Sequence, residues 1–406
     1  MAEIKKILIA NRGEIVQRAI RTIREMGKKS VVVYSAGDKN ASYLKHADEA
    51  VCIGGAKSSE SYLNIPAIIT AAEMTGCDAI FPGYGFLSEN QDFVEICQLH
   101  NIKFIGPSVE VMEKMADKSK AKDEMIKAGV PVVPGSKGAV HSVEEGRRVA
   151  LEIGYPIMAK ASAGGGGRGM RLIENEDKFD QLFTAASSEA LAAFGDGTMY
   201  LERFINNPRH IEVQVVGDSH GNAIHIGERD CSLQRRHQKV IEESPAILLN
   251  DETRAKLHDV AVKATKYLKY EGAGTFEFLA DDKQNIYFME MNTRLQVEHP
   301  VSEMVSGIDI VELMIKVAEG EKVPSQESIK FKGHAIECRI TAEDPNSFLP
   351  SPGKVTQWMV PGGRNVRVDS HVYTNYVVPP YYDSMIGKLI VWGRDRNKAI
   401  NIMKRA

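Results

Sequence analysis

Apolar and polar positions in the first part of the chain predict a parallel sheet flanked by helices. Buried-type strands are expected at 5–11, 30–34, 79–82 and 103–106. Apolar residues at helical spacing predict helices at 15–26 and 62–75, and the run from Ser88 to Gln91 resembles a capping box opening a third. Strands that alternate with helices form parallel sheets with helices on both faces.

The middle of the chain has the pattern of a small, separate α+β unit. A helix begins at Asp117 and ends at Gly129, before a proline-rich hinge at 130–135. The hinge is followed by a helix at 142–153, which Ser142 caps, and by a hairpin of strands at 155–161 and 170–173. After the hairpin we expect a helix at 177–194 and a strand at 199–205. Because residues 131–204 are tethered at both ends, we expect a mobile lid that closes over a ligand.

The pattern becomes strand-rich after Arg209. Antiparallel strands are expected at 211–216 and 223–228, a helix at 251–267, and strands at 274–279 and 287–292, whereas 229–243 is too polar for a core. We therefore predict an α/β protein with an N-terminal parallel-sheet domain at 1–113 and a linker helix at 114–130. The lid at 131–204 precedes a C-terminal mixed-sheet catalytic domain at 205–406, which runs into a β-rich segment.

Composition and charge narrow the function classes. The 406 residues carry a net charge of −3, which gives no general attraction to nucleic acid or anionic membranes. No apolar run approaches the ~20 residues of a membrane span, and the N-terminus lacks a signal-peptide core. Five widely spaced cysteines without a CxxC pair favour reduced thiols and a cytoplasmic location. The first strand turn lacks GxGxxG and the chain lacks GxxxxGK[ST], which disfavours NAD binding and excludes a P-loop ATPase.

The glycine loop of the predicted hairpin is a candidate phosphate site. Gly164 to Gly167 lie between two strands, with Lys160 before them and Arg168 and Arg171 inside or just after the loop. Bare backbone N–H groups can approach a polyphosphate closely, although glycine runs also occur in plain linkers. The segment 83–90 is a second candidate ligand site, because it follows a strand at the carboxyl edge of the sheet, where ligands usually bind. The alternative is that this segment is a plain turn between a strand and a helix.

Two acids on the last predicted strands form a candidate metal site. Glu277 alternates with apolar residues on one strand, and Glu290 and Asn292 share a face of the next. Carboxylate and amide oxygens suit Mg²⁺ or Mn²⁺, which would also bind nucleotide phosphates. The alternative is that both glutamates face solvent on the sheet surface.

The segment after Asn292 has the groups needed to bind and deprotonate a small oxyanion. Arg294, Gln296 and Glu298 alternate, which would bring a guanidinium, an amide and a carboxylate together in an extended segment. A surface Arg/Glu pair is the alternative.

Several longer motifs stand out along the chain: IANRGEI (9–15), PGYGFLSEN (82–90), the glycine loop, ERDCSLQRRHQK (228–239) and FMEMNTRLQVEHP (288–300). Further motifs are AEDP (342–345), LPSPG (349–353) and YYDSMIGKL (381–389). Taken together, these motifs resemble biotin carboxylase, the ATP-grasp component of acetyl-CoA carboxylase and its relatives. The match runs nearly end to end.

The resemblance implies roles for individual residues. Those implied for ATP are Lys118, Lys160, Gly165, Gly166, Gly167, Glu202, Ile205, His210, Gln234, His237, Glu277 and Glu290, with Mg²⁺ or Mn²⁺ on Glu277, Glu290 and Asn292. Bicarbonate is expected against Lys239, Arg294, Gln296, Val297 and Glu298, with Glu298 as the general base. Biotin is expected near Tyr84 and Arg339, and the residues implied to be catalytic are Glu298, Arg294, Arg339 and Lys239.

The resemblance also implies partners. No lysine between two methionines stands at a hairpin tip, so biotin is expected on a separate biotin carboxyl carrier protein, with carboxyltransferase subunits and a homodimer also implied. The family usually continues for roughly forty residues beyond Ala406, so a C-terminal truncation is expected. Acetyl-CoA, propionyl-CoA or pyruvate remain possible final acceptors. The competing interpretations are another bicarbonate-activating ATP-grasp ligase and a regulatory nucleotide-binding protein without catalytic activity.

Overall fold

The computed structural model describes residues 3–161, 169–236 and 238–406, which form two compact units. The first unit contains Met1–Val130, Arg209–Phe278 and Glu290–Ala406, and the second contains Pro131–Pro208 and Leu279–Met289. The second unit thus includes the residues of the expected lid, and it adds Leu279–Met289, which the sequence pattern places in the C-terminal domain. No helix among the described residues is long and apolar enough to cross a membrane.

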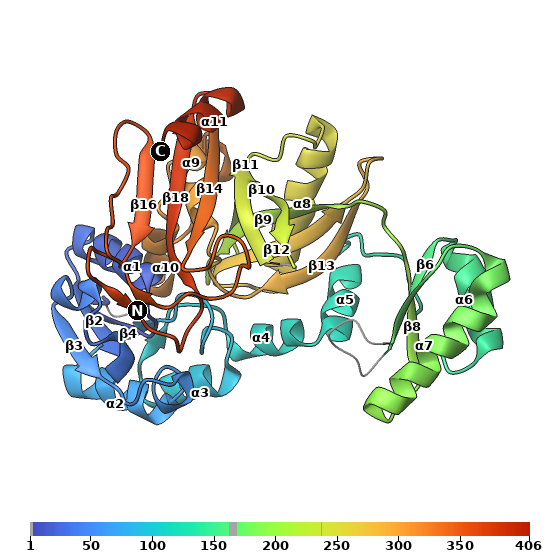
Figure 1. Ribbon diagram of the computed structural model, residues 1–406, viewed down its shortest axis with the longest axis horizontal. Helices are drawn as coiled ribbons and strands as arrows, with labels where there is room; N and C mark the ends of the chain where they lie inside the picture. The colour runs from blue at the N-terminus through green and yellow to red at the C-terminus, as the bar shows by residue number, and fades with distance from the viewer. Residues whose placement is uncertain (1–2, 162–168, 237) are drawn as a thin grey trace. The chain divides into compact units, whose positions relative to one another are not determined.

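A five-stranded parallel sheet begins the first unit, as the alternating pattern predicts (Figure 1). Its order is β3 (Glu49–Cys52), β2 (Lys29–Tyr34), β1 (Lys6–Ile9), β4 (Ala79–Phe81) and β5 (Lys103–Phe104). Helices α1 (Glu14–Glu25), α2 (Ile65–Thr75), α3 (Gln91–Leu99) and α4 (Val109–Ala116) belong to this part of the chain, and α5 (Lys118–Lys127) follows. Ile7 and Ile9 pack into one core and Leu8 into another, because successive strand side chains point to opposite faces.

Two details of this sheet differ from the expectation. Strand β3 was not predicted, because its residues are largely exposed at the sheet edge and carry little apolar signal. The capping-box assignment at Ser88 was wrong. The N-cap of α3 is Asn90, whose side chain accepts a hydrogen bond from the Phe93 amide at 2.8 Å.

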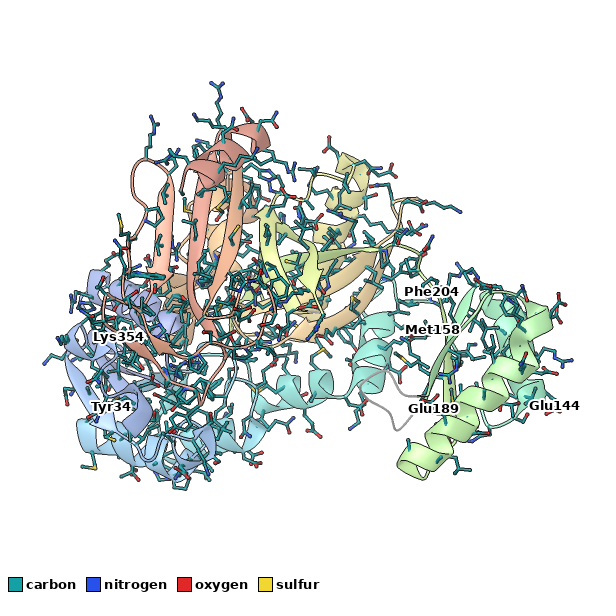
Figure 2. All side chains as sticks on the ribbon, viewed as in Figure 1. Tyr34, Glu144, Met158, Glu189, Phe204 and Lys354 are labelled. Atoms are coloured by element: carbon teal, nitrogen blue, oxygen red, sulfur yellow. The ribbon has the colours of Figure 1, made fainter. Side chains whose placement is uncertain are left out.

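The second unit contains the predicted hairpin. Its antiparallel sheet has the order β7 (Met170–Ile173), β6 (Ile157–Ala161) and β8 (Met199–Arg203). Helices α6 (Val143–Ile153) and α7 (Phe179–Phe194) supply most of the rest of its core; Figure 2 labels Glu144 on α6, Met158 on β6 and Glu189 on α7. The loop residues 162–168 lie outside the described residues.

An eight-stranded sheet dominates the rest of the chain. Its order is β13 (Ile286–Asn292), β12 (Gly272–Ala280), β9 (Arg209–Gly217), β10 (Ala223–Arg235), β11 (Gln238–Ser244), β14 (His334–Thr341), β18 (Met385–Gly393) and β16 (Val366–Ser370). Helix α8 (Asp251–Tyr267) lies against β9 and β10, α9 (His299–Ser306) against β10 and β14, and α11 (Arg396–Arg405) against β18 (Figure 1). The remaining elements of the described residues are α10 (Ile310–Ala318), the short strand pair β15 (Gly353–Lys354) and β17 (Val377–Val378), and 3₁₀ turns at Ala36–Asp38, Ser42–Lys45, Ser58–Glu60, Glu176–Lys178 and Gln326–Ser328.

The interpretation of 229–243 as too polar for a core was wrong. Most of the segment forms the end of β10 and most of β11, and Arg229, Asp230 and Glu242 are buried there. Buried charges are tolerated when they are paired with one another, which a pattern of polar letters does not reveal.

Candidate active site

The candidate site lies in the first unit, where neighbouring strands of the large sheet present charged side chains. On β9, His210, Glu212 and Gln214 alternate with Ile211, Val213 and Val215, so the three polar side chains share one face. Strand β10 adds Arg229, directly opposite Glu212, while β11 adds Lys239 and β12 adds Glu277. The bonds between these side chains join the four strands on this face.

Arg229 is the buried centre of this network, with a side chain that is 0 % exposed. Its guanidinium donates to Glu212 through Nε at 3.1 Å and Nη2 at 3.0 Å. It also donates to four neutral side-chain oxygens, those of Gln214, Thr275, Gln296 and Ser302. The planar fork therefore fixes β9, β12, Gln296 and α9 at once.

Lys239 holds three carboxylates together. Its Nζ contacts Glu212, Glu277 Oε1 at 3.0 Å and Glu298 Oε1 at 2.8 Å. Burial opposes the charged ammonium, but attraction to Glu212 and Glu298 raises the pKa of Lys239 above its ordinary range. The lysine is consequently a permanent cation at the centre of the acids.

Glu277 is held ionised by several donors. Its Oε1 also accepts from Asn292 at 2.8 Å and Gln296 at 2.7 Å, and its Oε2 lies 2.9 Å from His210 Nε2. Burial acts to raise the pKa of Glu277, but the bonds from His210 and Lys239 lower it to about 2. Burial acts to lower the pKa of His210, whereas Glu212 and Glu277 raise it to about 9.

The described residues offer two compact groups of metal-ligand atoms. One is His210, Glu212 and Glu277, and the other is Glu212, Cys231 and Glu298. The set expected from the sequence, Glu277, Glu290 and Asn292, has a different composition, with two acids and one amide. Asn292 is buried and bonded to Glu277, while Glu290 is half-buried on β13. Ionised Glu277 and the nearby amide fit an oxygen-ligated Mg²⁺.

Glu298 is held between two cations. It is 1 % exposed, with Lys239 on Oε1 and Arg339 Nη2 on Oε2 at 3.0 Å. Burial and Glu212 act to raise the pKa of Glu298, but Lys239 and Arg339 bring it below its ordinary value. Glu298 is therefore an ionised carboxylate at neutral pH, as a proton acceptor must be.

The structure corrects the interpretation of Arg294, Gln296 and Glu298 as one extended set. The segment is not a strand, and the three side chains have different partners. Arg294 donates to Glu89 at 2.9 Å and to Asn292 at 2.8 Å, and Gln296 bridges Arg229 and Glu277. Glu298 instead belongs with Lys239 and Arg339. An Arg/Glu pair does exist here, but its acid is Glu89, which is distant in sequence.

The other predicted site residues are distributed over both units. Tyr84 donates to Glu14, Gln234 approaches His210 Nδ1 at 3.3 Å, and the Val297 carbonyl accepts from Lys388 at 2.7 Å. Lys160, Glu202 and Ile205 belong to the second unit, where Lys160 and Glu202 form an ion pair at 2.5 Å. Lys118 is the first residue of α5. The remaining predicted residues, Gly165, Gly166, Gly167 and His237, lie outside the described part of the chain.

The sequence pattern did not single out two central residues, Glu212 and Arg229. Both have a signal that could have been used: Glu212 is a charge inside an apolar strand, flanked by His210 and Gln214 at alternate positions. Arg229 lies in the 228–239 motif, but nothing in the pattern shows that it is buried.

Family models match almost the whole chain. Residues 3–112 match the biotin carboxylase N-terminal domain, 117–326 the carbamoyl-phosphate synthase L chain ATP-binding domain, and 337–406 the biotin carboxylase C-terminal domain.

Relatives and solved structures agree with these matches. The chain is 57 % identical over 403 residues to a biotin carboxylase of Nostoc sp., covering 99 % of this chain and 90 % of the relative. A crystal structure of a biotin carboxylase complex from Campylobacter jejuni matches with a TM-score of 0.90 at 69 % identity, covering 100 % of this chain and 91 % of that one. The biotin carboxylase component of a pyruvate carboxylase matches with a TM-score of 0.90 at 51 % identity, covering 99 % and 90 %. The chain belongs to the biotin carboxylase family.

Proposed function

We propose that this protein carboxylates biotin with ATP and bicarbonate, through carboxyphosphate. The observation that carries the proposal is Glu298, a buried, ionised carboxylate held between Lys239 and Arg339. A base between two cations can take a proton from an anion that the same cations attract. Membership of the biotin carboxylase family supports the assignment.

In the proposed first step, bicarbonate binds against Lys239, Arg294, Gln296 and the Val297 amide. Glu298 accepts the bicarbonate proton, and the freed oxygen attacks the γ-phosphorus of ATP. The bond between that phosphorus and the bridging oxygen breaks, so ADP leaves and carboxyphosphate forms. Arg294 can still donate to an anion, since its bonds to Leu295 and Asn292 use one N–H of each terminal nitrogen.

In the proposed second step, carboxyphosphate releases CO₂ and phosphate. The phosphate removes the proton from the biotin ureido nitrogen, which then attacks CO₂. Arg339 stabilises the negative charge that develops on the ureido oxygen, with Tyr84 nearby. The guanidinium donates to Glu242 and Glu298, and these two bonds orient it for this role.

For ATP, we propose the contacts that the family resemblance implies. Glu277, Glu290 and Asn292 would hold Mg²⁺ (or Mn²⁺), which supplies charge neutralisation for the phosphates when bound. His210, Gln234, His237 and Lys118 would contact the nucleotide. Lys160, the glycine loop and the backbone from Glu202 to Ile205 would contribute further contacts, acting as a lid. Solved relatives are named as complexes with MgADP and with bicarbonate.

We further propose that the biotin arrives on a carboxyl carrier protein and that the product goes to carboxyltransferase subunits, with this chain as a cytoplasmic homodimer. One structural relative is described as a biotin carboxylase domain dimer. The first choice of pathway is acetyl-CoA carboxylase. A pyruvate or propionyl-CoA carboxylase is the alternative, since one solved relative is part of a pyruvate carboxylase.

A second candidate function is bicarbonate activation for ammonia. It is favoured only by the ATP-binding family model at 117–326, which is named for carbamoyl-phosphate synthase. The flanking models, both of biotin carboxylase, disfavour it.

One assay separates the two candidates: ATP hydrolysis with bicarbonate, measured with free biotin, with ammonia and with neither. Biotin should stimulate turnover and ammonia should not; the reverse result would exclude biotin carboxylation. Glu298→Gln should lose at least about a hundredfold in kcat while still binding ATP, because it removes the base but keeps the shape. Retained turnover in this variant would contradict the base assignment.

A further inference from the structure

Behind Arg339, the large sheet carries a pair of buried acids that the proposed reaction does not use. Glu242 on β11 and Glu337 on β14 stand directly opposite each other in the antiparallel register. Both are 0 % exposed. Side chains that are opposite in such a pair lie on the same face of the sheet with Cβ atoms about 5 Å apart, so each acid is within reach of the other.

The two acids have unequal partners. Glu242 accepts from Arg339 Nε through Oε1 at 2.7 Å, while its Oε2 has no hydrogen-bond partner among the described residues. Neither oxygen of Glu337 has a partner in that part of the chain. Buried polar atoms are normally hydrogen-bonded, so three unpartnered oxygens on facing acids need an explanation.

The nearby cations are already engaged by other groups. Arg339 is bonded to Glu242 and Glu298, and Lys388 donates to the Val297 carbonyl at 2.7 Å and lies 3.1 Å from Glu14. An ionised Glu337 would therefore be a buried charge with no hydrogen-bond donor among the described residues, which is strongly unfavourable. Two facing carboxylates also cannot both be ionised at low cost.

A single proton resolves both problems. A protonated carboxyl group is a donor, and an O–H bond from one acid to an ionised partner is short and strong. Burial raises the pKa of Glu337 well above its ordinary value. Burial also raises the pKa of Glu242, opposed by Arg339, to about 7.

We propose that Glu337 carries a proton and donates a hydrogen bond to Glu242, which keeps Glu242 ionised as the anchor of Arg339. Glu337 is then a positioning residue, three hydrogen bonds removed from the biotin oxygen, and this role rests on the proposed function of Arg339. Protonation of Glu242 releases the Nε side of the guanidinium and leaves Arg339 attached to Glu298 alone.

The other ionisable groups around the pair do not supply the missing donor. Those that interact electrostatically with it are Tyr84, Glu212, Cys231, Glu298, Cys338, Arg339 and Lys388. Tyr84 already donates to Glu14. Burial raises the pKa of the Cys338 thiol to about 11, and that of Cys231 also rises, so neither adds a charge at neutral pH.

The test compares Glu337→Gln with Glu337→Leu in the full chain. The Gln amide keeps a donor without a charge. When kcat for free biotin is measured as a function of pH, the midpoint of its decrease at acidic pH (the acid limb) should therefore be the same as in the unchanged protein. Leu removes the donor, so that limb should move to higher pH by about one to two units, as expected for losing one hydrogen bond to a charged group. The proposal is overturned if the acid limb has the same midpoint in Glu337→Gln and Glu337→Leu, or if the midpoint moves in Glu337→Gln.

An infrared measurement tests the proton without relying on activity or on a folded Leu variant. At mildly alkaline pH, the spectrum should contain the carbonyl band of a protonated carboxyl group that disappears in Glu337→Gln. A spectrum unchanged by the substitution refutes the protonated state. If biotin does not stimulate turnover at all, the proposed function fails, whereas the infrared result still decides the state of Glu337.

Discussion

The central prediction concerns Arg229, because one side chain joins the buried network of the candidate site. Replacing it with methionine keeps much of the volume of the side chain but removes six hydrogen bonds to five residues. Breaking a buried ion pair from one side costs about 3–5 kcal/mol. Glu212 keeps Lys239 and His210 as cationic neighbours, so we expect the lower end, about 3 kcal/mol.

The matched control is Arg396→Met. Arg396 also binds a glutamate with two nitrogens, at 2.6 and 3.1 Å to Glu243, but its side chain is 41 % exposed. Exposed pairs contribute at most about 1 kcal/mol. The free energy of unfolding in urea, followed by circular dichroism, should separate the two variants clearly. Equal losses would refute the claim that burial of the Arg229 network, rather than ion pairing itself, stabilises this unit.

Two further predictions address a helix cap and an acid-sensitive histidine. Asn90→Ala should destabilise by about 1 kcal/mol, and Asn90→Asp should not, because only the alanine leaves the Phe93 amide of α3 uncapped. Thermal unfolding of both variants measures this, and equal stabilities would contradict the cap. Burial, and to a smaller extent the electrostatic effect of His258, lowers the pKa of His225 to about 3. As the pH falls, the unfolded chain therefore binds a proton at this residue before the folded chain does, and the free energy of unfolding decreases between about pH 6.5 and pH 3. His225→Phe, which keeps the ring stacked on His258 and Phe331, should therefore unfold at lower pH in an acid titration; an unchanged or higher midpoint would be inconsistent with a neutral His225.

Much of the secondary structure could be predicted because it depends on local patterns. The helix expected at 251–267 has those bounds as α8, and the strands on both sides of the glycine loop pair as the predicted hairpin. Ser142 caps its helix as expected, and Asp117 is the N-cap of the helix that was expected to begin there. Errors occur where the local signal is weak or misleading, as at the exposed edge strand β3 and at Ser88, two residues before the true cap.

The sequence by itself determined the α/β fold, the family and most of the charged residues of the candidate site, because motifs and hydrophobic periodicity depend on residues that are close together in the chain. Only the tertiary structure decided which charges meet. Strand register places Glu212 against Arg229 and Glu242 against Glu337, and packing joins Glu298 to Lys239 and Arg339 and Arg294 to Glu89. The physical reason is that burial, which makes a charge require a partner, depends on contacts between residues far apart in the chain.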